Sequence, residues 1–378
     1  MLSNMQQKTH LKKEYFSLNF TNEIKSELKN FENKESQYTI PVFIPHFGCK
    51  NECIFCNQRK ISGNTKKVRP DEVDEIIKKR LEEIGDTRRS IQIAFFGGSF
   101  TGIGINDQIA YLKVAKKYID AGIVKCIRLS TRPDYISTKI LKILKFYGVE
   151  TIELGVQSMS NEVLEYSKRG HTKQDVIRAT RLIHLFGIRL GIQIMVGLPR
   201  STILKEEETI KAVLKLKPED MRIYPVYVIH PSKLYDLYID GKYIPLTLDE
   251  TIKRVGIILR YCQKTNVRII RLGLQSTDEI TVSNKEIAGP VCDNIAEYVI
   301  SDLLRQDLDN RISKGVESGV ISEDKINIVV LTIENRYASI VVGPKKINKI
   351  YIENKYSKYN LKLKIKGEKD IEESYICI

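Results

Sequence analysis

The sequence predicts an α/β protein, a partial (β/α)6 barrel followed by a small C-terminal α+β domain. The chain has 378 residues, which is long enough for one large domain and a smaller appendage. Between residues 38 and 290, short apolar runs alternate with amphipathic helical stretches, the pattern of β/α units around a parallel sheet. After about residue 290 this alternation stops. We therefore expect a polar extension (1–37), a barrel (38–290) and a C-terminal domain (291–378).

Six apolar runs are expected to form the barrel strands. They are 39–44, 91–96, 125–130, 151–155, 189–195 and 220–224. The stretches between them repeat apolar residues at helical spacing, as Val73, Ile76, Ile77 and Leu81 do within 70–84. Further helices are expected at 106–120, 137–147, 173–186 and 203–216. Sites in parallel sheets lie at the carboxyl ends of the strands, so functional motifs are expected there.

The two flanks of the barrel differ from it in composition. Residues 1–37 are polar and rich in Lys, Glu and Asn, and we expect a mobile or loosely docked extension. In the C-terminal domain a helix is expected at 293–314 and short strands at 326–333, 338–342, 349–352 and 361–365. Between Gly343 and Asp370, nine lysines face three acidic residues, with tyrosines among them. This pattern suits RNA docking, and equally a solvated sheet whose edge lysines prevent aggregation.

The overall composition excludes several classes of protein. The hydrophobic fraction of 42% and charged fraction of 29% are those of a soluble globular protein. No apolar run reaches the roughly 18 residues of a transmembrane helix, and the polar start lacks a secretory signal, so we expect a cytoplasmic protein. The net charge of +14 favours polyanions such as RNA, although a Lys-rich proteome would give the same surplus. Seven cysteines, an odd number, do not make a disulfide scaffold of this length.

Three of the seven cysteines lie within eight residues, directly after the first expected strand. Cys49, Cys53 and Cys56 have the spacing C-x3-C-x2-C. Three thiolates at this spacing can each bind one iron of a 4Fe-4S cluster, which leaves the fourth iron without a protein ligand and open to chemistry. A zinc site completed by His46 is the leading alternative, although structural zinc sites usually join two separated pairs of ligands.

With Phe55 just before the last cysteine, this loop resembles that of the radical S-adenosylmethionine (SAM) superfamily. The resemblance implies a radical SAM barrel in which the open iron chelates the amino and carboxyl groups of SAM's methionine. It also implies that an electron from a reducing donor cleaves the sulfonium to give a 5′-deoxyadenosyl radical. So reactive a species requires a dry, enclosed site, which a barrel provides.

Two further motifs end the second and third strands. Gly97 and Gly98, followed by Ser99, let the backbone approach a ligand, although any tight turn after a strand could use them. Their place after the cysteine loop resembles the superfamily segment that binds SAM's methionine amino group. Ser130 and Thr131 end the third strand and lead into a turn. The resemblance implies that they meet SAM's ribose or methionine.

Polar residues of the later strands complete the expected SAM site. Gln157 ends the fourth strand, and Arg169, whose planar guanidinium suits a carboxylate, follows the next short helix. The resemblance implies that both face SAM's carboxylate and ribose. Gln193 interrupts an apolar strand, so its buried amide needs a partner, either an adenosine hydroxyl or a core neighbour. The resemblance also implies that Met195 and Tyr224 lie at the adenine.

Together these motifs resemble the radical domain of the Elongator catalytic subunit over residues 39–290. The segments that carry the resemblance are 130–134, 153–158, 169–172, 222–225 and 234–243. That subunit modifies the wobble uridine of tRNA with acetyl-CoA, so an RNA (tRNA) substrate is implied. His171, within the third segment, is more often structural than catalytic in such a position. The chain departs from the Elongator subunit in two ways. Its gap between the first two cysteines is shorter. Only about 90 residues follow position 290, which are too few for an acetyltransferase domain, so the use of acetyl-CoA is in doubt.

The residues leave three functions open. The leading one is an Elongator-like radical SAM enzyme that acts on tRNA. The second is a radical SAM enzyme with a porphyrin-like or other small substrate, because Arg169 and the Gly-Val-Gln-Ser segment before it also resemble the oxygen-independent porphyrinogen oxidases. The third is a non-enzymatic RNA-binding protein whose loop is stapled by metal. No motif indicates which group reacts with the substrate.

Overall fold

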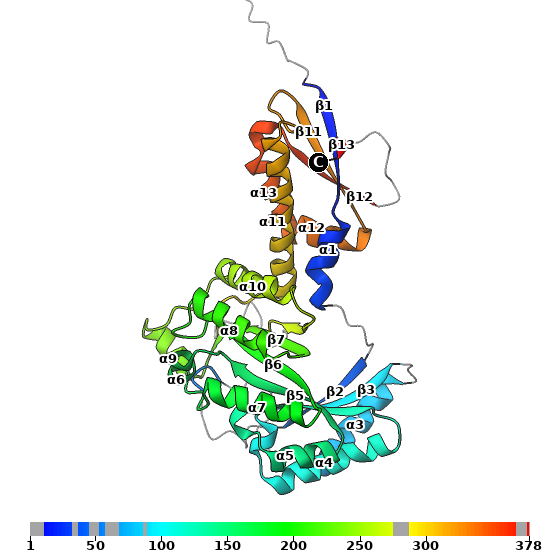
Figure 1. The fold of residues 1–378 in the computed structure, drawn as a ribbon, viewed down its shortest axis with the longest axis vertical. Coiled ribbons are helices and arrows are strands. Elements are labelled where there is room, and N and C mark those ends of the chain that lie inside the picture. The colour runs from blue at the N-terminus through cyan, green and yellow to red at the C-terminus, as the bar shows by residue number, and fades with distance from the viewer. Residues whose placement is uncertain are drawn as a thin grey trace, which may run out of the picture. The chain divides into compact units, whose positions relative to one another are not determined.

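The computed structural model describes residues 11–31, 37–44, 53–56, 68–85, 89–274, 287–367 and 376–377 (Figure 1). The chain forms two compact units, one of Asn30–Asp293 and one of Met1–Lys29 with Asn294–Ile378. We call the first the barrel unit and the second the terminal unit, because it combines residues from both ends of the sequence. Within the described ranges, no helix is long and apolar enough to cross a membrane.

The barrel unit is built on a sheet in which every neighbouring pair of strands is parallel. In spatial order the strands are β2 (Gln37–Ile44), β3 (Ser90–Gly97), β4 (Cys126–Thr131), β5 (Val149–Gln157), β6 (Arg189–Val196), β7 (Asp220–Pro225) and β9 (Arg268–Leu272). The sheet curls into a half-barrel with helices along it (Figure 1). The predicted α/β partial barrel and its six strands are therefore confirmed. The additional strand, β9, was not predicted, because five residues that mix arginine with apolar residues give a weak strand signal.

Eight helices of the described chain lie between the strands, and a side-chain cap marks the start of five of them. They are α3 (Pro70–Ile84), α4 (Ile105–Asp120), α5 (Thr138–Phe146), α6 (Asn161–Tyr166), α7 (Lys173–Leu185), α8 (Ile203–Lys215), α9 (Lys233–Ile239) and α10 (Leu248–Cys262). A hydroxyl accepts a first-turn backbone N–H at Ser137, Thr172, Thr202, Ser232 and Thr247. Each such cap stabilises its helix by about 1 kcal/mol. The apolar faces of these helices pack on the sheet, as Val73 and Ile77 of α3 do, with no exposed surface.

Strand β5 carries a charged residue in the middle of the sheet. Glu153 is 1% exposed and lies opposite Gly191 of β6 in the strand register. A Cβ at Gly191 would lie 2.8 Å from Glu153 Cγ, so glycine at this position makes room for the carboxylate. The half-barrel therefore accommodates the buried Glu153 side chain because its neighbour, Gly191, has no side chain.

The terminal unit is a second parallel sheet with its own helices. Its strands are, in spatial order, β12 (Lys362–Gly367), β11 (Ile326–Ile333), β1 (Lys13–Asn19) and β13 (Ile376–Cys377). Its helices are α1 (Thr21–Leu28), α11 (Ile295–Glu317), α12 (Ala338–Val342) and α13 (Ile347–Lys355). Helices α1, α12 and α13 all contact α11. The predicted helix at 293–314 and the strands at 326–333 and 361–365 correspond to α11, β11 and β12.

Two expectations about the terminal unit were wrong in detail. Part of 1–37 is not a loose extension, because β1 pairs along its whole length with β11. Only Phe16 and Leu18 bury their side chains there, so the alternation is too short to stand out in a polar sequence. The runs at 338–342 and 349–352 are helical rather than extended. Apolar runs this short do not distinguish a strand from a helix by periodicity.

Candidate active site at the carboxyl ends of the strands

The described part of the cysteine loop is held at Ile54. Its backbone N–H donates to Ser167 O at 3.2 Å, and its carbonyl accepts from Leu234 N at 2.8 Å. The end of α6 and the start of α9 therefore both bind the backbone of this one loop residue. The Ile54 side chain is 3% exposed in a core cluster. Within the loop, Cys56 N donates to Cys53 O at 3.0 Å. Cys53 and Cys56 are thus anchored, whereas Cys49 lies outside the described residues.

The side chain of Arg169 contacts one of the cysteines of the loop directly. Its Nη1 donates to Cys53 Sγ at 3.3 Å, and its Nη2 donates to the carbonyl of Gly155 at 2.5 Å. The side chains of Arg169 and Cys53 are each 7% exposed. A guanidinium against a buried sulfur stabilises negative charge on that sulfur, as a thiolate ligand of a metal requires. Gly155 therefore orients the cation, and the cation faces the cysteine.

Gln157 lies beside Arg169 in a strained conformation. Its φ is +67°, an angle that side-chain-bearing residues seldom adopt, and the β5–β6 register shifts between Gly155 and Gln157. A Cβ at Gly155 would be 3.2 Å from both Arg169 Nη2 and Gln157 Nε2, so the two side chains converge there. Gln157 Oε1 is buried and has no hydrogen-bond partner within the described structure, and neither has Arg169 Nε. Buried polar atoms left unpaired in this way cost about 1–3 kcal/mol each, which a polar ligand would recover.

The glycine pair at the end of β3 fixes the place where the chain leaves β2. Gly97 has φ +110°, and a Cβ there would be 2.2 Å from Ile44 O. Gly98 N donates to the same carbonyl at 3.2 Å. Ser99, the next residue, is 5% exposed. Glycine is thus required at position 97 because two backbones approach closely there, which is the structural use of this motif rather than the ligand-binding one. A ligand contact from Gly98 or Ser99 stays a prediction.

Comparison with known families decides the class of the chain. The pattern of the Radical SAM superfamily matches residues 43–213, and that of the Radical_SAM C-terminal domain matches residues 218–305. The chain belongs to the radical SAM superfamily. The two matched ranges include every described residue of the site above, so the contacts of Cys53, Gln157 and Arg169 are those of a radical SAM domain.

Individual relatives of this radical SAM chain cover parts of it. The tRNA uridine(34) acetyltransferase of Methanocaldococcus jannaschii is 31% identical over 197 residues, 47% of this chain and 36% of that protein. An uncharacterized protein of the same archaeon is 31% identical over 227 residues, 57% of this chain and 69% of that protein. Human Elongator complex protein 3 is 25% identical over 200 residues, 48% and 37% of the two chains. The chain therefore spans little more than a third of the acetyltransferase that it matches.

A solved structure confirms the fold of this radical SAM chain. The archaeal Elp3 of Methanocaldococcus infernus, with an N-terminal deletion, superposes with a TM-score of 0.56 at 22% identity. The superposition covers 73% of this chain and 64% of that one. At this identity the likeness establishes the half-barrel architecture and not the activity.

Three of the predicted SAM-site residues already have partners within the protein. Thr131 Oγ1 is 2.6 Å from Thr101 Oγ1, and both are buried. Gln193 Nε2 donates to Glu153 Oε2 at 3.0 Å and to Ser130 Oγ at 3.4 Å. The amide of Gln193 is thus satisfied on its donor side by core neighbours, one of the two partners expected for it. Ser130 Oγ accepts in this arrangement, so its own hydroxyl proton remains available to a ligand, as does the Gln193 side-chain oxygen.

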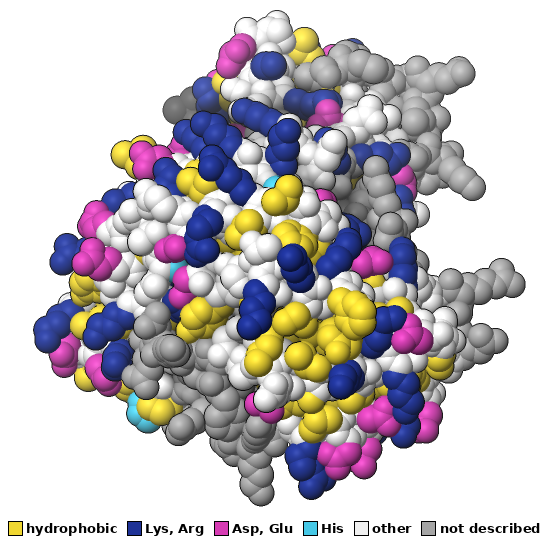
Figure 2. Space-filling model, turned by 60° about the horizontal axis from the view of Figure 1, so that its bottom comes forward, with side chains coloured by type: hydrophobic (Ala, Val, Ile, Leu, Met, Phe, Trp, Pro, Cys, Tyr) yellow, Lys and Arg dark blue, Asp and Glu magenta, His cyan; other side chains and the backbone are white. Residues whose placement is uncertain are grey.

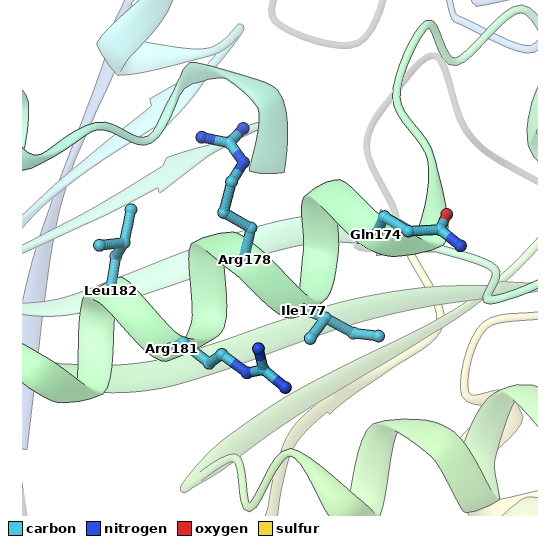
Figure 3. Close-up of a pocket in the computed structure, with 5 residues that line it drawn as sticks. All are labelled: Gln174, Ile177, Arg178, Arg181 and Leu182. Atoms are coloured by element: carbon cyan, nitrogen blue, oxygen red, sulfur yellow. The ribbon is translucent and has the colours of Figure 1, made fainter.

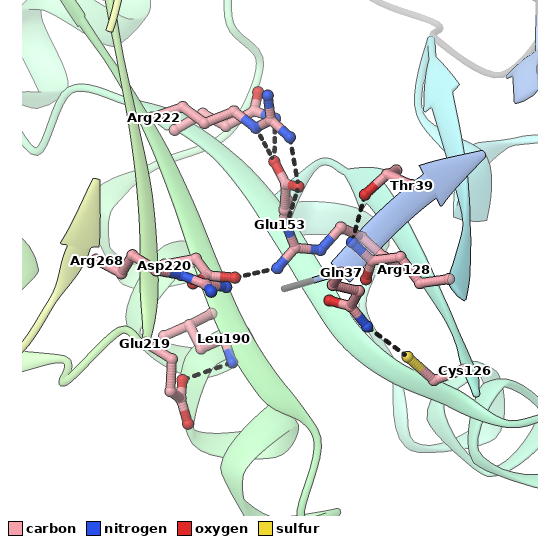
Figure 4. A network of polar contacts seen from close by, with 12 residues as sticks. Gln37, Thr39, Cys126, Arg128, Glu153, Leu190, Glu219, Asp220, Arg222 and Arg268 are labelled. Atoms are coloured by element: carbon pink, nitrogen blue, oxygen red, sulfur yellow. Dashed lines mark hydrogen bonds and ion pairs between the residues drawn. The ribbon is translucent and has the colours of Figure 1, made fainter. Parts of the chain in front are cut away.

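Sequence reasoning missed a buried charge network beneath the strand ends (Figure 4). Arg222 donates to Glu153 through Nε at 2.6 Å and Nη2 at 3.1 Å, and Arg128 Nη1 lies 3.3 Å from the same carboxylate. Arg128 also pairs with Asp220, whose second oxygen accepts from Arg268 at 2.8–2.9 Å. The available signal was the presence of charged residues within four strands of one sheet, β4, β5, β7 and β9. Since buried charges require partners, those strands had to bring them together.

His171 is a structural residue of the site rather than an acid or base. It is 4% exposed, and its Nε2 is 3.3 Å from Val156 O. Burial, followed by the charges of Arg169 and Arg132, lowers the pKa of His171 to about 3. The ring is therefore neutral at physiological pH and cannot donate a proton as an imidazolium, in agreement with the structural role expected for it.

The last two predicted residues lie at the ends of β6 and β7. Met195 and Tyr224 are partners in the strand register and are both partly buried. Burial is the main cause that raises the pKa of Tyr224, so its hydroxyl stays protonated. Met195 packs against the core cluster that contains Ile54. Met195 thus connects this edge of the sheet to the cysteine loop. Contact of Met195 and Tyr224 with adenine stays a prediction.

Two pockets lie outside this constellation. One of about 370 Å³ lies beside the loop and is lined by Tyr166, Gly197, Leu198, Pro199, Arg200, Ser201, Gly241, Lys242, Tyr243, Ile244, Leu246 and Arg254. Leu198 and Tyr243 pack in the same cluster as Ile54, which places this pocket next to the cysteines. The other, of about 400 Å³, is a depression along the surface of α7, where side chains such as Arg178 and Leu182 project (Figure 3). It contains no predicted site residue.

Proposed function

We propose that this chain is a radical SAM enzyme that modifies RNA, with tRNA as its substrate. The observation that carries the enzymatic part is the contact of Arg169 with Cys53 beside the unpartnered oxygen of Gln157. The RNA part is supported by relatives that are named for uridine 34 of tRNA. Because the chain matches little more than a third of those proteins, the substrate is inferred from the radical domain alone.

The cysteine loop suits a 4Fe-4S cluster. Cys49, Cys53 and Cys56 would bind three irons, and the hydrogen bond from Arg169 to the Cys53 sulfur would offset part of the cluster's negative charge. When bound, the reduced cluster supplies the electron that cleaves SAM into methionine and a 5′-deoxyadenosyl radical. A zinc staple would need a fourth ligand, and its candidate, His46, lies outside the described residues.

The polar atoms around Gly155 suit a SAM site. Gln157 Oε1 and Arg169 Nε have no partner among the described residues, which makes these two residues the strongest candidates for SAM contacts. Ser130, Thr131, Gln193, Met195, Tyr224 and the Gly97–Ser99 turn would line the remainder. Gln157 is 8% exposed and Arg169 is 7% exposed, so these residues exclude water from the reacting atoms. They hold the co-substrate in place and protect the radical; they do not transfer protons.

The charge of the protein supports a polyanionic substrate. The net charge is +14, and Lys and Arg side chains are spread over the face seen in Figure 2, with acidic side chains among them. The proposal requires an external electron donor. It does not include acetyl-CoA, because the similarity to the acetyltransferases covers only 36–37% of their length.

Nucleoside analysis tests the substrate. The tRNA of a strain that lacks the gene is digested and its nucleosides are compared with wild type by mass spectrometry. Loss of one modified nucleoside, restored by the wild-type gene and not by an Arg169→Ala variant, is the expected result. An unchanged nucleoside profile, together with SAM cleavage by the purified protein, would exclude tRNA and favour a small substrate instead.

A further inference from the structure

The sheet of the terminal unit has two different faces. Alternate residues of a strand point to opposite faces. On one face Phe16, Leu18, Val329 and Leu363 are at most 1% exposed. On the other face, Tyr15 is 37% exposed and alternates along β1 with those buried neighbours. Strands β1 and β12 therefore present side chains of this second face to solvent, whereas Ile328 and Val330 of β11 between them are only 5% and 4% exposed.

The register places a regular set of side chains on the exposed face. Across the strands, one row is Tyr15, Ile328 and Lys362, and the next is Ser17, Val330 and Lys364. Lys362 and Lys364 lie on β12, the edge of the sheet, and both are exposed. Alternate residues on a strand are about 6.6 Å apart, so the two lysines occupy neighbouring positions on the same face of the edge strand. The Nζ of Lys364 lies 5.7 Å from the centre of the Tyr15 ring.

Two pairs of lysines in this unit differ in their partners, Lys355 and Lys358 against Lys362 and Lys364. On the helical side, Lys355 pairs with Asp309 at 2.6 Å and Lys358 pairs with Glu323 at 3.3 Å. On β12, neither Lys362 nor Lys364 forms an ion pair with any residue that the structure describes. The positive charge of the strand lysines is therefore not neutralised within the described chain, which distinguishes them from the helical lysines.

We infer that the exposed face centred on Tyr15, Lys362 and Lys364, here called the lysine face, binds RNA. Two lysines at neighbouring positions of one strand face suit adjacent phosphates, and Tyr15, which is 37% exposed, offers a stacking surface to a base. The strands β1, β11 and β12 lie outside the two matched ranges, which end at residue 305, so the radical SAM family assigns this surface no role. The inference rests on the proposed RNA substrate and adds the surface that would hold it.

A purely structural role is the competing explanation. The aliphatic parts of long lysine side chains can cover apolar residues, and Ile328 and Val330 are only 5% and 4% exposed. Glutamine keeps much of that aliphatic cover and removes the charge. A structural role therefore predicts that Lys→Gln variants bind RNA as wild type does, whereas RNA docking predicts a loss.

The test is tRNA binding by the full chain as a function of salt. Fluorescence anisotropy with labelled tRNA is measured for wild type, for Lys362→Gln/Lys364→Gln, and for the matched control Lys355→Gln/Lys358→Gln. The strand variant should lower the slope of log affinity against log salt by about 2, one for each phosphate contact. The control removes the same charge and should leave the slope unchanged. Tyr15→Leu should weaken binding roughly fivefold or more without a change of slope, and Tyr15→Phe should not.

The outcomes separate this inference from the proposed function. Equal slopes for the strand variant and wild type, or equal losses in strand and control variants, would overturn the lysine face while leaving an RNA substrate in place. If wild type makes 5′-deoxyadenosine from SAM but does not bind tRNA, the proposed substrate fails first. A strand variant that loses binding to anionic lipid vesicles and keeps its tRNA slope would assign the face to a membrane surface and overturn the inference. Thermal denaturation of each variant establishes that it is folded.

Discussion

The barrel unit and the terminal unit place their charged side chains in opposite ways. In the barrel unit, Glu153 and Asp220 are each 1% exposed and are surrounded by three arginines. On the edge strand of the terminal unit, in contrast, Lys362 and Lys364 are exposed and have no described acidic partner.

This difference indicates what each set of charges can do. A buried charge is tolerated only when its partners are fixed, so the network of the barrel unit makes the strands below the site rigid. An exposed lysine costs little stability and keeps its charge available to a partner. Rigid support for chemistry and a free surface for binding are thus separated between the two units.

The largest expected effect follows from removal of the buried carboxylate. Glu153→Gln leaves Arg222 without its bidentate partner and Arg128 with only Asp220. Leaving a buried charge uncompensated should lower the free energy of unfolding by about 3–5 kcal/mol. Chemical denaturation of the variant measures this loss.

The matched control for that variant lies in the terminal unit. Glu323→Gln removes an ion pair with Lys358 in which the two side chains are 61% and 63% exposed. Such a pair is worth at most about 1 kcal/mol. Equal losses in the two variants would show that the units do not differ in the way described.

A smaller effect is expected from glycines with left-handed backbones. Gly97→Ala in the barrel unit adds a Cβ that would be 2.2 Å from Ile44 O, so both backbone strain and a clash are introduced. The expected destabilisation is roughly 3 kcal/mol. Gly319→Ala in the terminal unit has a similar positive φ, +73°, and nothing within 4 Å, so strain alone should cost about 1 kcal/mol. Thermal denaturation of both variants checks the order, and a larger loss for Gly319→Ala would contradict it.

The effect that is smallest at neutral pH, and that grows as the pH falls, concerns the acid stability of the barrel unit. Burial of His171 lowers its pKa to about 3, whereas an unfolded histidine binds a proton below about pH 6.5. Between these values the unfolded state holds the extra proton, so stability falls as the pH falls, by up to about 1.4 kcal/mol per pH unit. His171→Gln should flatten this dependence in denaturation measured from pH 7 to pH 4. His184→Gln, at an exposed position of α7, is the control, and equal slopes in both variants would exclude His171 as the cause.

The fold of the barrel unit could be predicted because its signals are local. Each strand is an apolar run, and each motif follows a strand end, so parallel pairing alone brings Gly97, Thr131 and Gln157 to one edge. The network around Glu153 could not be predicted in the same way. Its paired members are far apart in the sequence, by 69 residues for Glu153 and Arg222 and by 92 for Arg128 and Asp220, and only the strand order decides which of them meet.

The terminal unit shows where sequence reasoning reached its limit. Strand β1 joins β11, with Lys13 opposite Ile326, so the two halves of this sheet come from opposite ends of the sequence. A seven-residue strand with two buried side chains gives too little periodicity to indicate such a partner. The excess of lysine was visible, but only the structure distinguishes Lys355 and Lys358, which have acidic partners, from Lys362 and Lys364, which have none among the described residues.

The most direct test of the central claim is the metal and SAM chemistry of the cysteine loop. Wild type, Cys53→Ala and Cys126→Ala are purified and reconstituted without oxygen, and iron, sulfide and 5′-deoxyadenosine are measured. Burial raises the pKa of the Cys126 thiol to about 11, so this cysteine is a control outside the loop. We expect about four irons per chain and SAM cleavage in wild type and Cys126→Ala, and neither in Cys53→Ala. One equivalent of zinc without iron in wild type, or SAM cleavage retained by Cys53→Ala, would contradict the account.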